Sequence, residues 1–152
     1  MRVAVGDARL GLLDLAGDSA DVVIGDAFGS DAVPWHLATA EWADEVRRVL
    51  KPGGLYALNV LDFQPLDLAR AEAATLLESF ADVRLVTFLD ADGDLFGGSV
   101  VLLASDRPMP RDAGSDAEGA ITSDRGEVEA FARDADVLRD DFAPVDQLLT
   151  TE

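Results

Sequence analysis

The sequence predicts an α/β fold built around a parallel sheet, and three observations indicate it. Short apolar runs alternate with helical patterns from the N-terminus onward. A helical pattern at 41–50 lies between apolar runs at 21–24 and 55–60, which is the rhythm of a β-α-β unit. Two later apolar runs, 83–89 and 99–104, flank a turn and predict an antiparallel hairpin at one edge of the sheet.

The first expected elements are a strand at 2–5 and a helix at 10–15. The next strand, 21–24, leads into Asp26 and a glycine-containing turn. The ligand crevice of an open parallel sheet lies beyond the carboxyl ends of its strands. Asp26 is therefore the first candidate for a functional residue.

The helix at 41–50 has the clearest pattern, because its apolar residues recur at helical spacing. Thr39 is its expected N-cap, and Pro52-Gly53-Gly54 is expected to end it. A second helix is expected at 66–80. The aspartates of the turn at 90–94 lack the glutamate and preceding helix of a calcium-binding EF-hand, so we interpret this segment as a hairpin turn.

Three parts are expected along the chain. Residues 1–106 carry the alternating strand and helix patterns and form the α/β domain. Residues 107–126 carry acidic and small residues without apolar periodicity, which predicts an acidic, poorly ordered loop or linker. Residues 127–152 supply a helix at 127–138 and a tail that packs on the same domain.

Composition limits the classes of function. The absence of cysteine excludes disulfides and thiolate metal sites, and with His36 as the single histidine no metal is expected. The 30 acidic against 12 basic residues give a net charge of −18, which argues against nucleic-acid and membrane partners. We interpret the charge as a solvated surface, although it would also attract cations such as polyamines. The short apolar runs and the N-terminus indicate a cytoplasmic protein.

Three polar residues each have two interpretations. Asp7 could accept a hydrogen bond from an exocyclic amine such as that of adenine, or it could cap the helix that follows. His36 could reach the crevice, although a packed loop residue is the favoured interpretation. Asn59, at a strand end, could face a substrate or simply end the strand.

Five segments also stand in an informative order, at residues 5–9, 21–29, 34–42, 50–54 and 140–148. Together they resemble spermidine synthase-like proteins, members of the polyamine aminopropyltransferase family, which have the class I S-adenosylmethionine-dependent methyltransferase fold. The resemblance implies a Rossmann-like sheet of the methyltransferase type. It corresponds to the C-terminal portion of that family, and it implies that residues 1–106 are a partial Rossmann-like nucleotide-binding domain.

The resemblance also implies roles for individual residues. Asp7, Ala8 and Ala27 would bind the adenine end of decarboxylated S-adenosylmethionine, or of S-adenosylmethionine itself. Asp26 would be catalytic, because a carboxylate can orient the attacking amine of a polyamine or other small amine and accept its proton. No metal is required for this chemistry.

The chain departs from the family pattern in two ways. Gly29 stands where aminopropyltransferases carry a second aspartate; Asp31 is the candidate substitute, and His36 is a further substrate-binding candidate. The strand at 2–5 corresponds to the third strand of the fold, so the sheet is expected to lack its first two strands. Exposed strand edges invite pairing, which predicts a homodimer or a partner chain that completes the sheet.

The predicted function is therefore a transferase that moves an aminopropyl group from decarboxylated S-adenosylmethionine to a polyamine, or an inactive form of it. A noncatalytic interaction half-domain is one alternative. The other is an S-adenosylmethionine-dependent methyltransferase, which Gly29 permits because methyl transfer does not need the paired aspartate.

Overall fold

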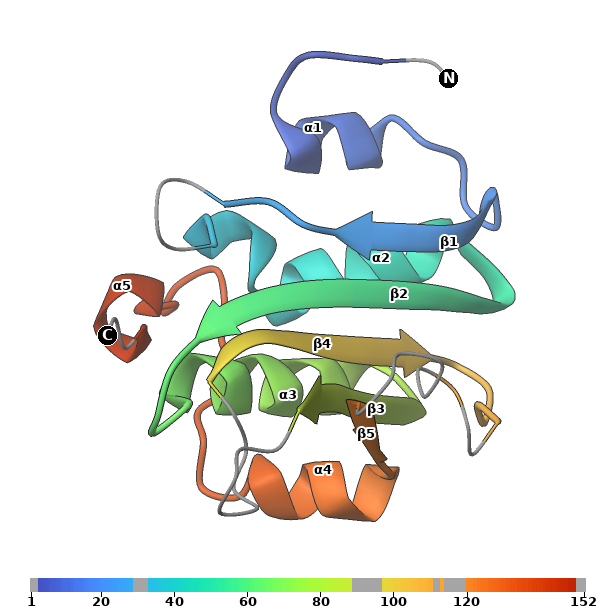
Figure 1. Cartoon of the computed structure of the whole chain (residues 1–152). Helices are drawn as coiled ribbons and strands as arrows, with labels where there is room; N and C mark the ends of the chain where they lie inside the picture. Colours follow the sequence, from blue (N-terminus) through green and yellow to red (C-terminus); the bar gives the residue numbers. More distant parts are fainter. Residues whose placement is uncertain (1–2, 29–32, 89–96, 111–112, 114–119, 150–152) are drawn as a thin grey trace.

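The expected α/β fold is confirmed by a computed structural model that describes residues 3–28, 33–88, 97–110, 113 and 120–149 (Figure 1). Its strands are β1 (Ala20–Gly25), β2 (Leu50–Asp62), β3 (Asp82–Phe88), β4 (Gly98–Ser105) and β5 (Ala120–Ser123). Its helices are α1 (Ala8–Leu13), α2 (Ala40–Val49), α3 (Asp67–Ser79), α4 (Arg125–Phe131) and α5 (Val145–Leu148), with a short 3-10 helix η1 (Trp35–Leu37).

The five strands form one sheet in the order β1-β2-β4-β3-β5. β1 is parallel to β2, and the other neighbouring pairs are antiparallel. The hairpin of β3 and β4 is present, but it does not form the edge of the sheet, because β5 pairs with the outer side of β3. The turn at 90–94 lies outside the described residues.

β5 corrects the expectation that residues 107–126 form only a loop. Residues 120–123 pair with residues 85–88 of β3. Four residues are too few to show an alternating apolar pattern in the sequence. β5 forms because its backbone groups pair with those of β3. α4 also begins in this segment, at Arg125. The expected helix end at 138 was wrong, because α4 stops at Phe131.

The expected strand at 2–5 is absent from the described part of the chain. Residues 3–5 have no regular structure, and Val5 is fully exposed. A strand requires a neighbouring strand that accepts and donates backbone hydrogen bonds. None of the described strands pairs with residues 3–5. One edge of the described sheet is therefore the outer side of β1, and the other is the outer side of β5.

The other helix predictions hold closely. Thr39 caps α2, since its hydroxyl accepts a hydrogen bond from the Trp42 N–H at 3.3 Å. α2 ends at Val49, one residue before its expected end, because β2 begins directly at Leu50. The Pro-Gly-Gly segment that was expected to end the helix lies within the first part of this strand instead. In the described ranges, no helix is long and apolar enough to cross a membrane.

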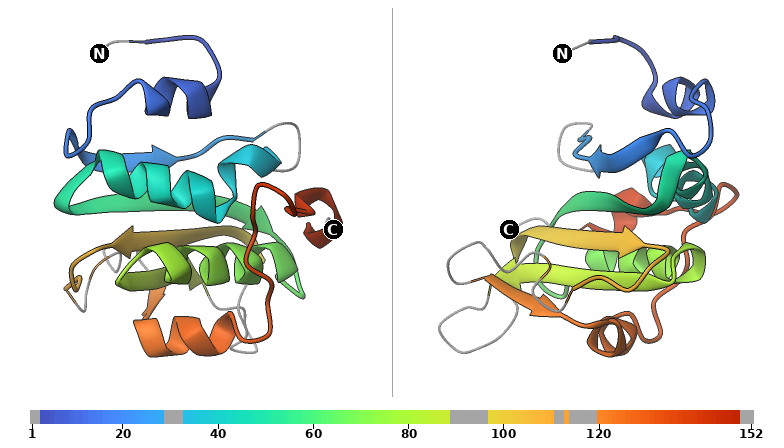
Figure 2. Two further views of the ribbon diagram at one scale, coloured as in Figure 1. Left: turned by 180° about the vertical axis from the view of Figure 1, so that it is seen from behind. Right: turned by 90° about the vertical axis from the view of Figure 1, so that its right-hand side faces the viewer.

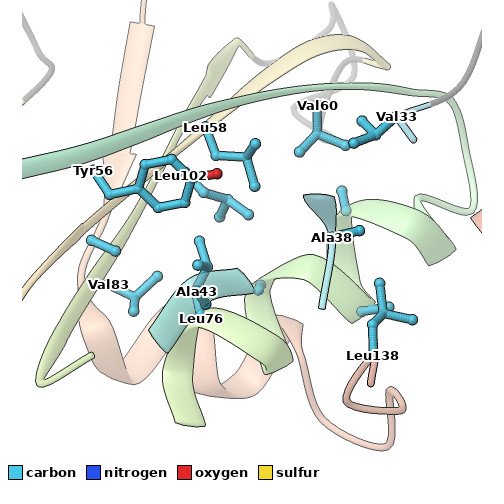
Figure 3. Packing of buried hydrophobic residues seen from close by; sticks show 14 of the residues in the cluster. Val33, Ala38, Ala43, Tyr56, Leu58, Val60, Leu76, Val83, Leu102 and Leu138 are labelled. Carbon is cyan, nitrogen blue, oxygen red and sulfur yellow. The ribbon is translucent and has the colours of Figure 1, made fainter. Parts of the chain in front are cut away.

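Helices α2, α3 and α4 lie against one face of the sheet (Figure 2). The core lies in this interface, where Tyr56, Leu58 and Leu102 from the strands meet Leu76 of α3 (Figure 3). Alternate residues of the strands point to the opposite face. No described helix covers that face, and it carries exposed apolar side chains: Val22, Ile24, Leu61 and Phe88.

Candidate functional site

A cavity of about 330 Å³ runs along the free edge of β1. Its walls come from β1, β2, α1, α2 and η1, and most of its lining is apolar, including Ala8, Leu12, Ala27, Val33 and Leu37. The charged residue of the lining is Asp26. A cavity of this size and chemistry lies at the small end of the range for sites that hold small molecules.

The inner wall of the cavity depends on a glycine. A Cβ at Gly25 would lie 2.7 Å from the Tyr56 hydroxyl oxygen and 3.0 Å from Leu58 Cδ1, so only glycine lets the strand pass this close. The buried Tyr56 hydroxyl accepts a hydrogen bond from Trp42 Nε1 at 3.2 Å. Burial raises the pKa of Tyr56 well above its ordinary value, so this hydroxyl stays protonated.

Asp26 lies directly after β1 at the rim of the cavity and is exposed. Asn59 of β2 donates a hydrogen bond from Nδ2 to Asp26 Oδ1 at 2.9 Å. The Ser99 hydroxyl of β4 donates in turn to Asn59 Oδ1. The sequence predicts the place of Asp26 from the apolar run before it, whereas nothing in the sequence links it to Ser99.

Asp7 is the N-cap of α1, which is the second of the two interpretations of this residue. Its Oδ1 accepts a hydrogen bond from the Leu10 N–H at 2.9 Å and so begins α1. Its other carboxylate oxygen lies 3.6 Å from His36 Nε2. Ala8, the next residue, lines the cavity. A contact between Asp7 and adenine stays a prediction, and Asp31 lies outside the described residues.

Arg9 is a residue of the site that sequence reasoning missed. Its guanidinium binds both carboxylate oxygens of Asp140, at 2.8 and 2.6 Å, and donates to the His36 carbonyl at 3.0 Å. Hydrogen bonds from Arg9, together with one from the Thr39 hydroxyl, hold the pKa of Asp140 below its ordinary value. These contacts tie α1 to η1 and to the C-terminal tail. They therefore hold the outer wall of the cavity in place.

This arrangement suits a ligand with two chemically different ends. The apolar cavity can accept a flat, uncharged ring, and the carboxylate at its rim can hold a polar or cationic group. Among the described residues, no group of three or more histidine, aspartate and glutamate side chains is placed to hold a metal ion.

No family model matches the chain, and no curated protein matches it either. Solved structures do resemble it. A probable spermidine synthase from Corynebacterium glutamicum ATCC 13032 superposes with a TM-score of 0.77 at 28% identity, over 90% of this chain and 53% of that one.

Two further spermidine synthases show the same fold at lower identity. The enzyme from Thermotoga maritima has a TM-score of 0.58 at 15% identity, over 99% of this chain and 47% of that one. A spermidine synthase in complex with the transition state analogue AdoDATO has a TM-score of 0.60 at 16% identity, over 99% and 48% of the two chains. The chain therefore has a spermidine synthase-like fold and spans about half the length of these structures.

Proposed function

We propose that this chain contributes to a spermidine synthase-like transferase site, in which it holds the adenosyl group of a sulfonium donor and orients the attacking amine. The observation that carries the proposal is the apolar cavity with Asp26 at its rim, at the carboxyl end of β1. A site at this end of a parallel strand is typical of α/β enzymes that bind nucleotides. The donor is decarboxylated S-adenosylmethionine and the acceptor is a polyamine.

The similar structures support this choice of substrates. One is described as a probable spermidine synthase and two as spermidine synthases, and one of these two is a complex with a transition state analogue. The net charge of −18 supports it as well, because a strongly negative protein attracts polycationic amines by long-range electrostatics.

The proposed mechanism is a direct displacement. The amine nitrogen forms a bond to the methylene carbon beside the sulfonium, the carbon–sulfur bond breaks, and its electron pair stays on sulfur, which leaves as the thioether methylthioadenosine. Asp26 orients the amine and accepts the proton that its nitrogen loses. Ala8 and Ala27, which line the cavity, contact the adenosyl group, and Asp7 accepts a hydrogen bond from the adenine amine.

Calorimetric titration with methylthioadenosine tests the adenosyl site. We expect micromolar binding by the unaltered chain and binding weakened roughly tenfold by Asp7→Ala, because a hydrogen bond to a charged acceptor is lost. Asp7 also caps α1, so Asp7→Ser serves as the control variant: serine keeps an N-cap acceptor but is too short to reach the adenine. No heat at millimolar ligand would refute the proposed site.

The free edge of β1 supports a second proposal, that this chain acts as a noncatalytic interaction half-domain. Val22 and Ile24 are 51% and 73% exposed, and no described strand pairs with the outer edge of β1. Exposed strand edges and apolar patches pair readily with another chain. We propose that a second copy, or a partner chain, adds to the sheet here.

Sedimentation at increasing concentration tests pairing of two copies. We expect a dimer at tens of micromolar, weakened at least several-fold by Ile24→Lys, because a charge on the exposed face disfavours edge pairing. The control is Phe88→Lys, an equally charged change on the same face but on β3, which β2 and β4 separate from β1. A monomer at all concentrations would refute pairing of two copies, and the proposal would then require a separate partner chain at this edge.

A further inference from the structure

We propose that Asn59 and Ser99 are positioning residues for Asp26, and that their hydrogen bonds determine which carboxylate oxygen receives the amine. The inference rests on the proposed function, because it concerns the same carboxylate. It assigns a role to two residues on neighbouring strands that the sequence does not connect with each other.

The register of the sheet brings the three side chains together. β1 and β2 are parallel with Gly25 opposite Leu58, so the next residues, Asp26 and Asn59, fall side by side. β2 and β4 are antiparallel with Leu61 opposite Ser99, which places Ser99 diagonally across from Asn59 on the same face. This face is the one without a described helix.

The chemistry of the three groups sets the direction of both hydrogen bonds. An ionised carboxylate only accepts, so Asn59 must turn its NH₂ group toward Asp26, at 2.9 Å. The carbonyl of the same amide then points away from Asp26 and accepts the hydrogen of the Ser99 hydroxyl. We call the two hydrogen bonds from Ser99 to Asn59 and from Asn59 to Asp26 the relay. Each group in the relay has one orientation that satisfies its neighbours.

The relay supplies a support that Asp26 lacks on its own strand. Asp26 lies one residue beyond the last paired residue of β1, which is an edge strand. Asn59 and Ser99 lie on strands with a neighbour on each side, β2 and β4. The inner strands thus hold Oδ1 of Asp26 through Asn59. In the described structure Oδ2 accepts no hydrogen bond, so it is the oxygen presented to the amine.

A purely structural role would predict something different. Hydrogen bonds between exposed polar side chains on a sheet stabilise the fold slightly and leave the reaction unchanged once the protein is folded. A positioning role predicts a loss of reaction rate with unchanged binding of the donor. The two roles therefore separate in measurements on folded variants.

The first test follows the Asn59 side-chain NH₂ signals by NMR on ¹⁵N-labelled protein and needs no activity. We expect these signals to shift in Asp26→Ala and in Ser99→Ala, because each removes a partner of the amide. The matched control is Asp21→Ala, which removes a carboxylate at the opposite end of β1. Unchanged Asn59 signals in both variants would overturn the proposal, whatever the activity of the chain.

The second test measures aminopropyl transfer with decarboxylated S-adenosylmethionine and a polyamine. We expect kcat to fall roughly ten- to a hundredfold in Asn59→Leu and in Ser99→Ala, since misplaced catalytic groups lose rate at this scale. The affinity for methylthioadenosine should stay unchanged, and Ser99→Thr, which keeps the hydroxyl, should restore the rate. Full activity of Asn59→Leu would overturn the positioning role, whereas an inactive unaltered chain would refute the proposed function and leave the NMR test decisive.

Discussion

Asp26→Asn is expected to slow amine alkylation about a hundredfold or more, because general-base assistance is worth this much in comparable reactions. The asparagine has nearly the same shape as aspartate and keeps an oxygen that can accept the hydrogen bond from Asn59. It cannot take up the proton of the amine. The variant therefore removes proton transfer while it preserves the relay, and steady-state rates with decarboxylated donor and a polyamine measure the effect.

The matched control for this prediction is Asp21→Asn. Asp21 lies at the opposite end of β1, is 81% exposed and pairs with Lys51 at 2.9 Å. Its substitution makes the same change in net charge, so it accounts for weaker attraction of a cationic substrate. Equal activities of the two variants would show that Asp26 acts only through the overall charge of the protein.

The second large effect concerns Glu72, a carboxylic acid in the core. Glu72 lies on α3, is 1% exposed, and its Oε1 has no hydrogen-bond partner among the described residues. Burial raises the pKa of Glu72 well above its ordinary value, since a charge is costly in an apolar interior. The proposed mechanism does not use this residue, so it affects stability.

The pH dependence follows from the sign of that shift. The folded state holds the proton of Glu72 more tightly than the unfolded state does, so its contribution to stability is complete below about pH 4.5. The contribution decreases as the pH rises toward the pKa in the folded state. We expect Glu72→Gln to remove this decrease, as measured by urea unfolding at a series of pH values.

A methionine at position 72 should do more than remove the titration. It also replaces the unpartnered oxygen with apolar atoms, so we expect the free energy of unfolding at pH 7 to rise by about 1–3 kcal/mol. Glu78→Gln is the control, because Glu78 lies on the same helix but is exposed and paired with Arg139 at 2.6 Å. Parallel pH profiles for the unaltered chain and Glu72→Gln would contradict the buried-acid interpretation.

Local sequence patterns predicted those elements that show an apolar run or a capping residue of their own. The run Val22-Val23-Ile24 became β1, and Thr39 caps α2 because its hydroxyl can reach a backbone N–H within the same turn. The strand at 2–5 was wrong for the opposite reason. An apolar run becomes a strand only where a neighbouring strand satisfies its backbone, and the same requirement made β5 form without a visible pattern.

The residues of the candidate site also fall into those that local sequence predicts and those that only the folded chain brings together. The sequence by itself determined that Asp26 follows an apolar strand and that Asp7 can begin a helix, since both depend on neighbours a few residues away. Only the tertiary structure decided that Asn59 meets Asp26, that Ser99 meets Asn59, and that Arg9 binds Asp140 from 131 residues away. Such contacts depend on strand order and register, which the whole sheet determines together and which no local spacing encodes.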